Sequence, residues 1–227
     1  MPAHTSSVIK TARRAVSTRR VRQVTAASST PQIMRRWQPE QRVVLSTTWK
    51  RYLAIDKAFG DNNRPGTLLN YGDGQLEIMT TSSDHERIKI ILSRCLEAWL
   101  RHHDIVFYAR SNMTRRVVES EKAVEADESY SFARGEGEKL DLAIEVALSS
   151  GGLNKLPLYE KLGHPEVWIW RRGKIQVHAW DGAAYQQQPR SVRLPKIPLQ
   201  WIEELACWRD DYEAVSEFHR RLKAGKK

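Results

Sequence analysis

Two acidic residues and one lysine occupy positions where chemistry explains them better than packing does. Glu145 interrupts the run Leu140–Val146, whose Leu142, Ala143, Ile144 and Val146 predict a strand buried on both faces. Asp127 opens a shorter predicted strand ahead of it, and Lys155 falls in the first turn of a helix predicted over 153–162. A carboxylate inside a buried strand costs several kcal/mol to desolvate unless it is paired, protonated or bound to a cation.

Together these three residues form a set that could hold a divalent cation against a phosphate. Hard cations such as Mg²⁺, or Mn²⁺ in its place, take oxygen ligands from one or two carboxylates and from a substrate phosphate. The metal polarises the phosphoryl oxygen and lowers the pKa of a water molecule. A fixed lysine stabilises the negative charge that develops on phosphorus. We therefore expect Asp127 and Glu145 to bind the metal and Lys155 to stabilise charge.

Each residue also has a purely structural explanation. Asp127 would then be a solvent-exposed strand start, Glu145 half of a buried ion pair with an arginine, and Lys155 an exposed helix lysine. Only their combination favours a site. Glu77, inside the predicted strand QLEIM, and His85, at the start of the following helix, are further candidates. Their alternatives are an acid that faces solvent and a histidine that caps the helix or lies at the edge of the core.

Motifs typical of several other enzyme classes are absent from the sequence. The sequence contains no glycine-rich phosphate loop, no HExxH and no G-x-S-x-G, which argues against a nucleoside triphosphatase, a zinc protease and a serine hydrolase. Tyr159 lies four residues after Lys155, on the same helix face, and packing explains it better than a nucleophilic role does. Cys95 and Cys207 lie in apolar helical contexts, which favours buried thiols in a reducing cytoplasm.

A sheet flanked by helices is needed to position these residues. The apolar periodicity predicts helices over 46–59, 84–103, 153–162 and 199–223, the last broken near 208–210. It predicts strands over 67–71, 75–79, 106–109, 113–118, 129–132, 140–146, 166–171, 174–180 and 184–188, with a loop over 119–125. Asp-Gly in the first pair is a strong hairpin signal. The expected fold is therefore one α/β (α+β) domain with a central mixed sheet.

Positive charge is concentrated at the N-terminus. The net charge is +10, and residues 1–39 hold eight Lys/Arg and no acid, which leaves two of the ten charges for the rest of the chain. We expect 1–40 to be a disordered basic tail, 41–205 the domain and 206–227 a C-terminal helix. A basic tail of this kind raises the affinity of the protein for any polyanion. Alternatively, these residues are a tail without function, a targeting presequence, or the product of a start codon assigned too far upstream. No run is apolar enough for a membrane span.

The motifs also resemble a known family. The segments DGQLEIM…DHERI, DLAIEVALSS, NKLPLYEKLGHPEVWIW and KIQVHAW, with the Asp127 strand, resemble the Uma-type restriction endonuclease family. That family is a branch of the PD-(D/E)XK, restriction-endonuclease-like superfamily. Asp127 matches the PD aspartate, Glu145 the (D/E), and Lys155 a lysine that has migrated from the strand to the following helix. Glu77 and His85 match positions that often carry those residue types. The motif's proline is replaced by Ala126.

The resemblance implies a restriction-endonuclease-like core and a Mg²⁺-dependent DNA endonuclease that hydrolyses phosphodiester bonds. Asp127, Glu145, Lys155 and Glu77 would carry the catalysis. Cutting both strands of a duplex would favour a homodimer. The alternative is a catalytically inactive nucleic-acid-binding or scaffold module that kept the fold. Asp127 and Glu145 carboxylates on opposite sides of the sheet would end the nuclease interpretation.

Overall fold

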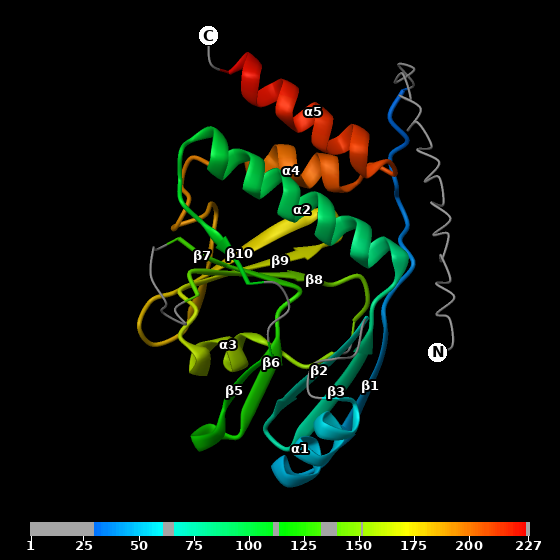
Figure 1. The fold of residues 1–227 in the computed structure, drawn as a ribbon, viewed down its shortest axis with the longest axis vertical. Helices are drawn as coiled ribbons and strands as arrows, with labels where there is room; N and C mark the ends of the chain where they lie inside the picture. The colour runs from blue at the N-terminus through cyan, green and yellow to red at the C-terminus, as the bar shows by residue number, and fades with distance from the viewer. Residues whose placement is uncertain (1–29, 61–65, 111–113, 133–139, 151, 226–227) are drawn as a thin grey trace, which may run out of the picture. The chain divides into compact units, whose positions relative to one another are not determined.

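The computed structural model describes residues 30–60, 66–110, 114–132, 140–150 and 152–225 (Figure 1). The chain divides into two compact units, Met1–Thr30 and Pro31–Lys227, and every described residue except Thr30 belongs to the second. Five α-helices and two sheets make up the described part of the second unit. The predicted α/β class is confirmed.

The larger sheet has six strands in the order β11-β10-β9-β8-β7-β4. Its strands are β4 (Tyr108–Ala109), β7 (Glu128–Ser131), β8 (Leu142–Val146), β9 (Glu166–Arg171), β10 (Lys174–Trp180) and β11 (Tyr185–Gln188). Only β8 and β9 run parallel. A parallel pair needs a crossover, and α3 (Leu156–Leu162) supplies it. The sheet is therefore mixed, as predicted.

The smaller sheet is antiparallel, with the order β1-β3-β2-β6-β5. Its strands are β1 (Gln41–Ser46), β2 (Thr67–Gly72), β3 (Gln75–Thr80), β5 (Thr114–Val117) and β6 (Lys122–Glu125). Asp73 and Gly74 have φ of 52° and 75°, the conformation that a two-residue hairpin turn requires. The loop predicted over 119–125 is wrong, because buried Ala123 and Val124 place β6 in this sheet after the short 3₁₀ helix η1 (Val118–Ser120).

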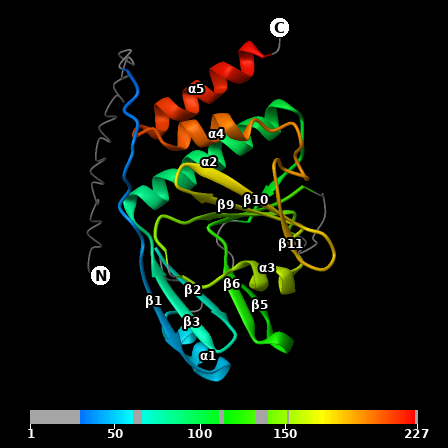
Figure 2. The same ribbon diagram turned by 180° about the vertical axis from the view of Figure 1, so that it is seen from behind.

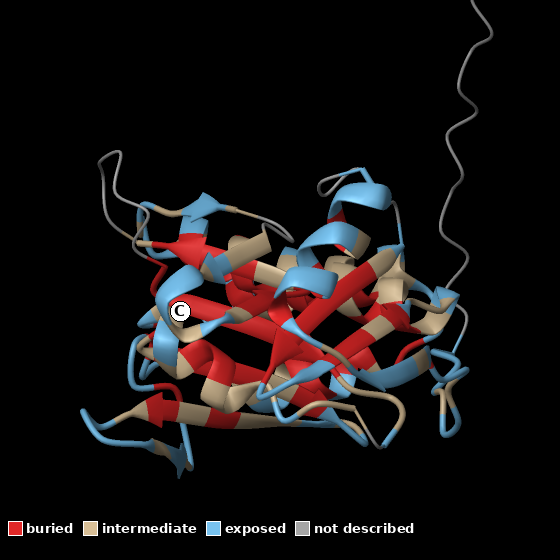
Figure 3. Cartoon of the chain, turned by 90° about the horizontal axis from the view of Figure 1, so that it is seen from below, coloured by how far each residue is buried: buried red, intermediate tan, exposed pale blue. Residues whose placement is uncertain are grey.

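The helices cover both sheets (Figures 1 and 2). The larger sheet lies between a layer formed by α2 (Ser83–His102), α4 (Leu199–Ala206) and α5 (Asp211–Ala224) on one face and α3 on the other. The apolar stripe of α2 packs with β8 and β9 in the main core, which runs through the interior in Figure 3. Helix α1 (Trp49–Ala58) packs on the smaller sheet through Trp49 and Tyr52. None of the described helices is both long and apolar enough to cross a membrane.

Two helix starts differ from the prediction. The helix predicted from residue 46 begins at Trp49, because Ser46 ends β1, which pairs with β3. Thr48 caps α1 by accepting a hydrogen bond from the Arg51 amide. Helix α3 begins at Leu156, so Lys155 lies immediately before it and not in its first turn. The prediction of a break in the last helix is confirmed by the gap between α4 and α5.

The folded unit begins ahead of the boundary predicted at residue 40. Ile33 forms a β-bridge with Trp208, and the Met34 amide donates a hydrogen bond to the Cys207 carbonyl at 2.7 Å. Glu40 is buried, at 4% exposure. The last part of the segment assigned to the tail therefore contacts the connection between α4 and α5, while most of the tail, 1–29, lies outside the described residues.

Candidate active site

Asp127 lies where the chain passes from one sheet to the other. It sits between β6 of the smaller sheet and β7 of the larger one, at 2% exposure, so the interpretation as a solvent-exposed strand start is wrong. The Val146 amide donates a hydrogen bond of 2.7 Å to Asp127 Oδ2. The antiparallel pairing of β7 with β8 brings that amide here. The sheet junction thus points the Asp127 carboxylate at β8, the strand that carries Glu145.

Glu145 and Lys155 form a buried ion pair. Lys155 Nζ lies 2.7 Å from Glu145 Oε2, and the lysine side chain is 11% exposed. The alternative of an exposed helix lysine is therefore wrong, and Glu145 pairs with a lysine where an arginine was the alternative. Tyr159, on α3, donates a hydrogen bond to Glu145 Oε1. Because α3 packs across the sheet junction with Val124, Ala126 and Ala143, both partners approach Glu145 from the same side.

The pKa values show that the three groups share one electrostatic environment. Burial raises the pKa of Glu145 to about 7, and the negative charge of Asp127 adds to this against the opposing charge of Lys155. Burial opposes the ionisation of Asp127, but the charges of His85 and Lys155 outweigh it and lower its pKa. Burial likewise opposes the charge on Lys155, yet Glu145 and Asp127 raise its pKa. The two carboxylates therefore sense each other and the same lysine.

His85 is part of this cluster and not only a helix-capping residue. It is fully buried in the first turn of α2, and its Nε2 lies 3.2 Å from Asp127 Oδ2. Burial disfavours the imidazolium, but the Asp127 charge outweighs it and raises the pKa of His85 to about 10. The Ser82 hydroxyl caps the helix instead, by accepting a hydrogen bond from the His85 amide. At neutral pH Asp127 therefore faces a cation.

Glu77 is buried, so the alternative that it faces solvent is wrong. Arg42 Nη1 donates to Glu77 Oε2 at 3.0 Å, the Asn70 side chain donates to Oε1 at 3.0 Å, and the Leu153 amide donates to Oε2 at 2.9 Å. The charge of Glu77 also raises the pKa of Lys155. Glu77 thus borders the cluster, held by Arg42, Asn70 and the Leu153 amide.

Sequence reasoning missed two neighbours of the site. Glu40 and Arg42 form an ion pair of 3.2 Å at the start of β1. They lie at the predicted boundary between tail and domain, where no motif or periodicity pointed to them. Arg42 also lines a cavity of about 330 Å³ together with Glu145, Lys155, Ser149 and Arg171. Two of its three basic side chains already pair with carboxylates, Lys155 with Glu145 and Arg42 with Glu40 and Glu77, so the lining of the cavity combines positive and negative groups.

The donor set fits a hard divalent cation. No group of three or more His, Cys, Asp or Glu side chains that could hold a metal occurs in the described ranges. Mg²⁺, however, is usually bound by one or two carboxylates, with water and substrate phosphate completing its shell. Asp127 and Glu145 are two buried carboxylates whose mutual repulsion is offset here by His85 and Lys155. A cation between them would relieve the same repulsion.

Comparison with known proteins identifies the family of the chain. Residues 49–206 match the Uma2 family, whose description is "Putative restriction endonuclease". The match includes β8, α3 and the junction that carries Asp127, and it leaves out Glu40 and Arg42. No curated protein matches the chain. Since the match spans well over half of the sequence, the chain belongs to the Uma2 restriction endonuclease family.

Proposed function

We propose that the protein is a Mg²⁺-dependent DNA endonuclease, which also accepts Mn²⁺ and hydrolyses phosphodiester bonds. The observation that carries the proposal is the buried cluster of Asp127, Glu145 and Lys155 beside a cavity lined by basic side chains. Family membership supports a nuclease, and the cluster supplies the groups that metal-dependent hydrolysis needs. Cleavage of both strands would favour a two-fold dimer.

Each side chain has a distinct task in the proposed reaction. Asp127 and Glu145 would hold the metal, which when bound polarises the phosphoryl oxygen and lowers the pKa of a water molecule. Lys155 provides a preorganised positive charge for the oxygen atoms on which negative charge develops. Tyr159 orients Glu145 through its hydroxyl group. Glu77 assists by holding the chain just ahead of Lys155.

A catalytically inactive DNA-binding module is the second candidate. The observation in its favour is that each carboxylate already has a cationic partner, Lys155 for Glu145 and His85 for Asp127. In such a module these pairs would serve stability alone, and the arginine and lysine side chains that line the cavity would bind a backbone phosphate without cleaving it.

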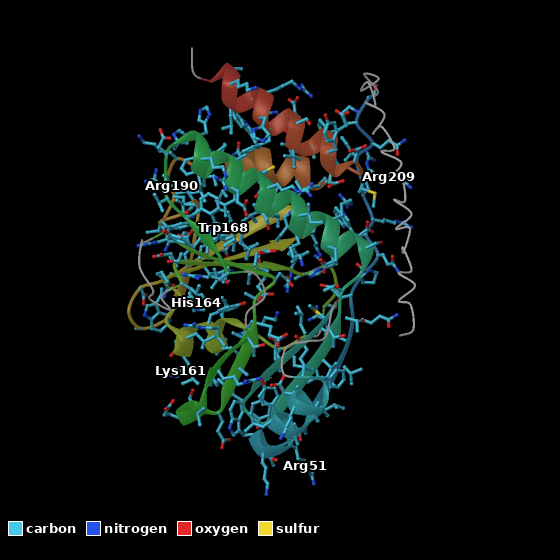
Figure 4. The ribbon with its side chains drawn as sticks, in the orientation of Figure 1. Arg51, Lys161, His164, Trp168, Arg190 and Arg209 are labelled. Atoms are coloured by element: carbon cyan, nitrogen blue, oxygen red, sulfur yellow. The ribbon has the colours of Figure 1, made fainter. Side chains whose placement is uncertain are left out.

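Plasmid cleavage with Mg²⁺ or Mn²⁺, and with EDTA as the metal-free control, separates the two candidates. Lys155→Ala should lower the cleavage rate about 10²–10³-fold, the scale for loss of one preorganised donor, and should keep Mn²⁺ binding in calorimetry. Asp127→Ala and Glu145→Ala should lose metal binding and cleavage together, without additivity. Lys161→Ala is the matched control, because Lys161 lies on α3 but is half exposed (Figure 4). Metal-independent cleavage, or full activity in Lys155→Ala, would refute the mechanism.

A further inference from the structure

Arg42 bridges two buried carboxylates at the edge of the smaller sheet. Its Nη1 lies 3.0 Å from Glu77 Oε2 and its Nη2 lies 3.2 Å from Glu40 Oε1, and neither carboxylate side chain is exposed. Glu40 precedes β1 and Glu77 lies on β3, which pairs with β1. One guanidinium group therefore joins acids from two adjacent strands, and its planar fork matches a bridge of this kind.

The same two carboxylates hold the connection between β8 and α3, of which residues 147–150 and 152–155 are described. The Leu148 amide donates to Glu40 Oε1 at 2.8 Å, near the start of the connection. The Leu153 amide donates to Glu77 Oε2 at 2.9 Å, near its end. Lys155 follows two residues after that second attachment. The segment that delivers Lys155 to Glu145 is thus fastened at both ends to acids that Arg42 joins.

Gly152 shows how closely the connection passes Arg42. A Cβ atom at this position would lie 1.7 Å from Arg42 Nη1 and 2.3 Å from Glu77 Oε2. Any side chain here would displace the Arg42–Glu77 ion pair or push the connection away from it. Glycine at residue 152 therefore follows from the close approach of the guanidinium group.

We propose that Arg42 is a positioning residue for Lys155: by bridging Glu40 and Glu77 it fixes the connection that places the Lys155 ammonium against Glu145. The expected loss of activity rests on the proposed function. The positioning of Lys155 by Arg42 does not depend on it. Arg42 acts through the two carboxylates and the two amides that they hold. Because it lies outside the matched residues 49–206, family membership does not assign it this role.

Kinetics of two variants test the catalytic consequence. Arg42→Lys keeps the charge but loses the fork that reaches both acids, and Gly152→Ala disturbs the same contact from the side of the connection. Each should lower kcat by about 10²-fold, the effect of a misplacement near 1 Å, and leave KM and the Mn²⁺ affinity within about 2-fold of wild type. Arg51→Lys is the matched control, because Arg51 is an exposed residue of α1, labelled at the lower end of the ribbon in Figure 4. Wild-type kcat in both variants would overturn the inference.

Two further readouts need no activity. Amide hydrogen exchange by NMR should become at least about 10-fold faster at Leu148 and Leu153 in Arg42→Lys and Gly152→Ala. The Val146 amide, which donates to Asp127, should keep its rate. Acetylation of Lys155 under competitive labelling should also become faster relative to Lys161. Equal acceleration of all three amides would mean general destabilisation, and unchanged labelling of Lys155 would mean that Arg42 does not position it; either result overturns the inference.

These readouts keep the two proposals separable. If the wild-type protein does not cleave DNA while exchange and labelling change as expected, the endonuclease proposal fails and the positioning by Arg42 stands. If the wild type cleaves and both variants keep its kcat and its labelling rate, the positioning role fails and the endonuclease proposal stands.

Discussion

Replacing His164 should remove a pH dependence of stability that the fold creates. His164 follows α3 (Figure 4), is 2% exposed, and has no hydrogen-bond partner for either ring nitrogen in the described residues. Its ring packs edge-on against Tyr159, with ring centroids 5.0 Å apart. Burial, and then the positive charge of Arg115, lower its pKa from 6.5 to about 4. The folded protein therefore keeps this imidazole neutral.

The sign and the size of the effect follow from linkage. Above pH 6.5 the imidazole is neutral in both the folded and the unfolded state, so it does not change the free energy of unfolding. As the pH falls from 6.5 towards 4, the unfolded chain binds a proton that the folded protein rejects, so stability is lost. At 1.36 kcal/mol per pKa unit, the shift from 6.5 to about 4 corresponds to a loss of about 3 kcal/mol. Glu128, whose pKa burial raises to about 7, and Glu145 act in the opposite direction over part of this range.

The difference between two proteins isolates the histidine. Urea unfolding of wild type and His164→Leu should be compared at pH 7, 6, 5 and 4, because leucine fills a similar volume and does not titrate. The stability of wild type relative to the variant should fall by about 3 kcal/mol between pH 7 and 4, since the two carboxyl groups cancel in the difference. His219→Leu is the control, because His219 is exposed on α5, and its curve should run parallel to wild type. Parallel curves for His164→Leu would refute the reasoning.

Three other changes to the chain test separate features of the structure. Tyr159→Phe leaves a buried oxygen of Glu145 without its donor. It should lower the free energy of unfolding in urea by about 1–3 kcal/mol and lower the cleavage rate. An unchanged rate would exclude the orienting role. Glu166 accepts hydrogen bonds from one indole, one hydroxyl and two backbone amides, so Glu166→Ala should destabilise by about 3 kcal/mol or more without changing cleavage per folded molecule. Deleting residues 1–30, which hold six Lys/Arg, should reduce the log–log salt slope of DNA binding by up to about 5 and leave the stability unchanged. Deleting residues 1–39 should also destabilise the protein, because the contact with Trp208 is lost. An unchanged salt slope would show that the tail makes no phosphate contact.

Much of the fold could be predicted because its signals are local. The apolar stripe of α2 and the Asp73-Gly74 hairpin are visible in a few consecutive residues, since helical and strand periodicity depend on side chains that share one face. β6 escaped detection because it has only four residues and begins and ends with charged side chains. Its burial comes from pairing with β5, just ahead of it in the sequence, and with β2, which is distant in the sequence.

The sequence by itself determined which residue types were available for the site: an acid in a buried strand, a second acid ahead of it and a lysine after it. Only the tertiary structure decided the partners of these charges. Asp127 meets His85 because the sheet junction faces the first turn of α2, and Glu145 meets Lys155 because α3 crosses that junction. Arg42 meets Glu77 through the pairing of β1 with β3. A buried charge must find its counter-charge in space, and strand pairing over long sequence separations, which local pattern does not encode, determines where that counter-charge lies.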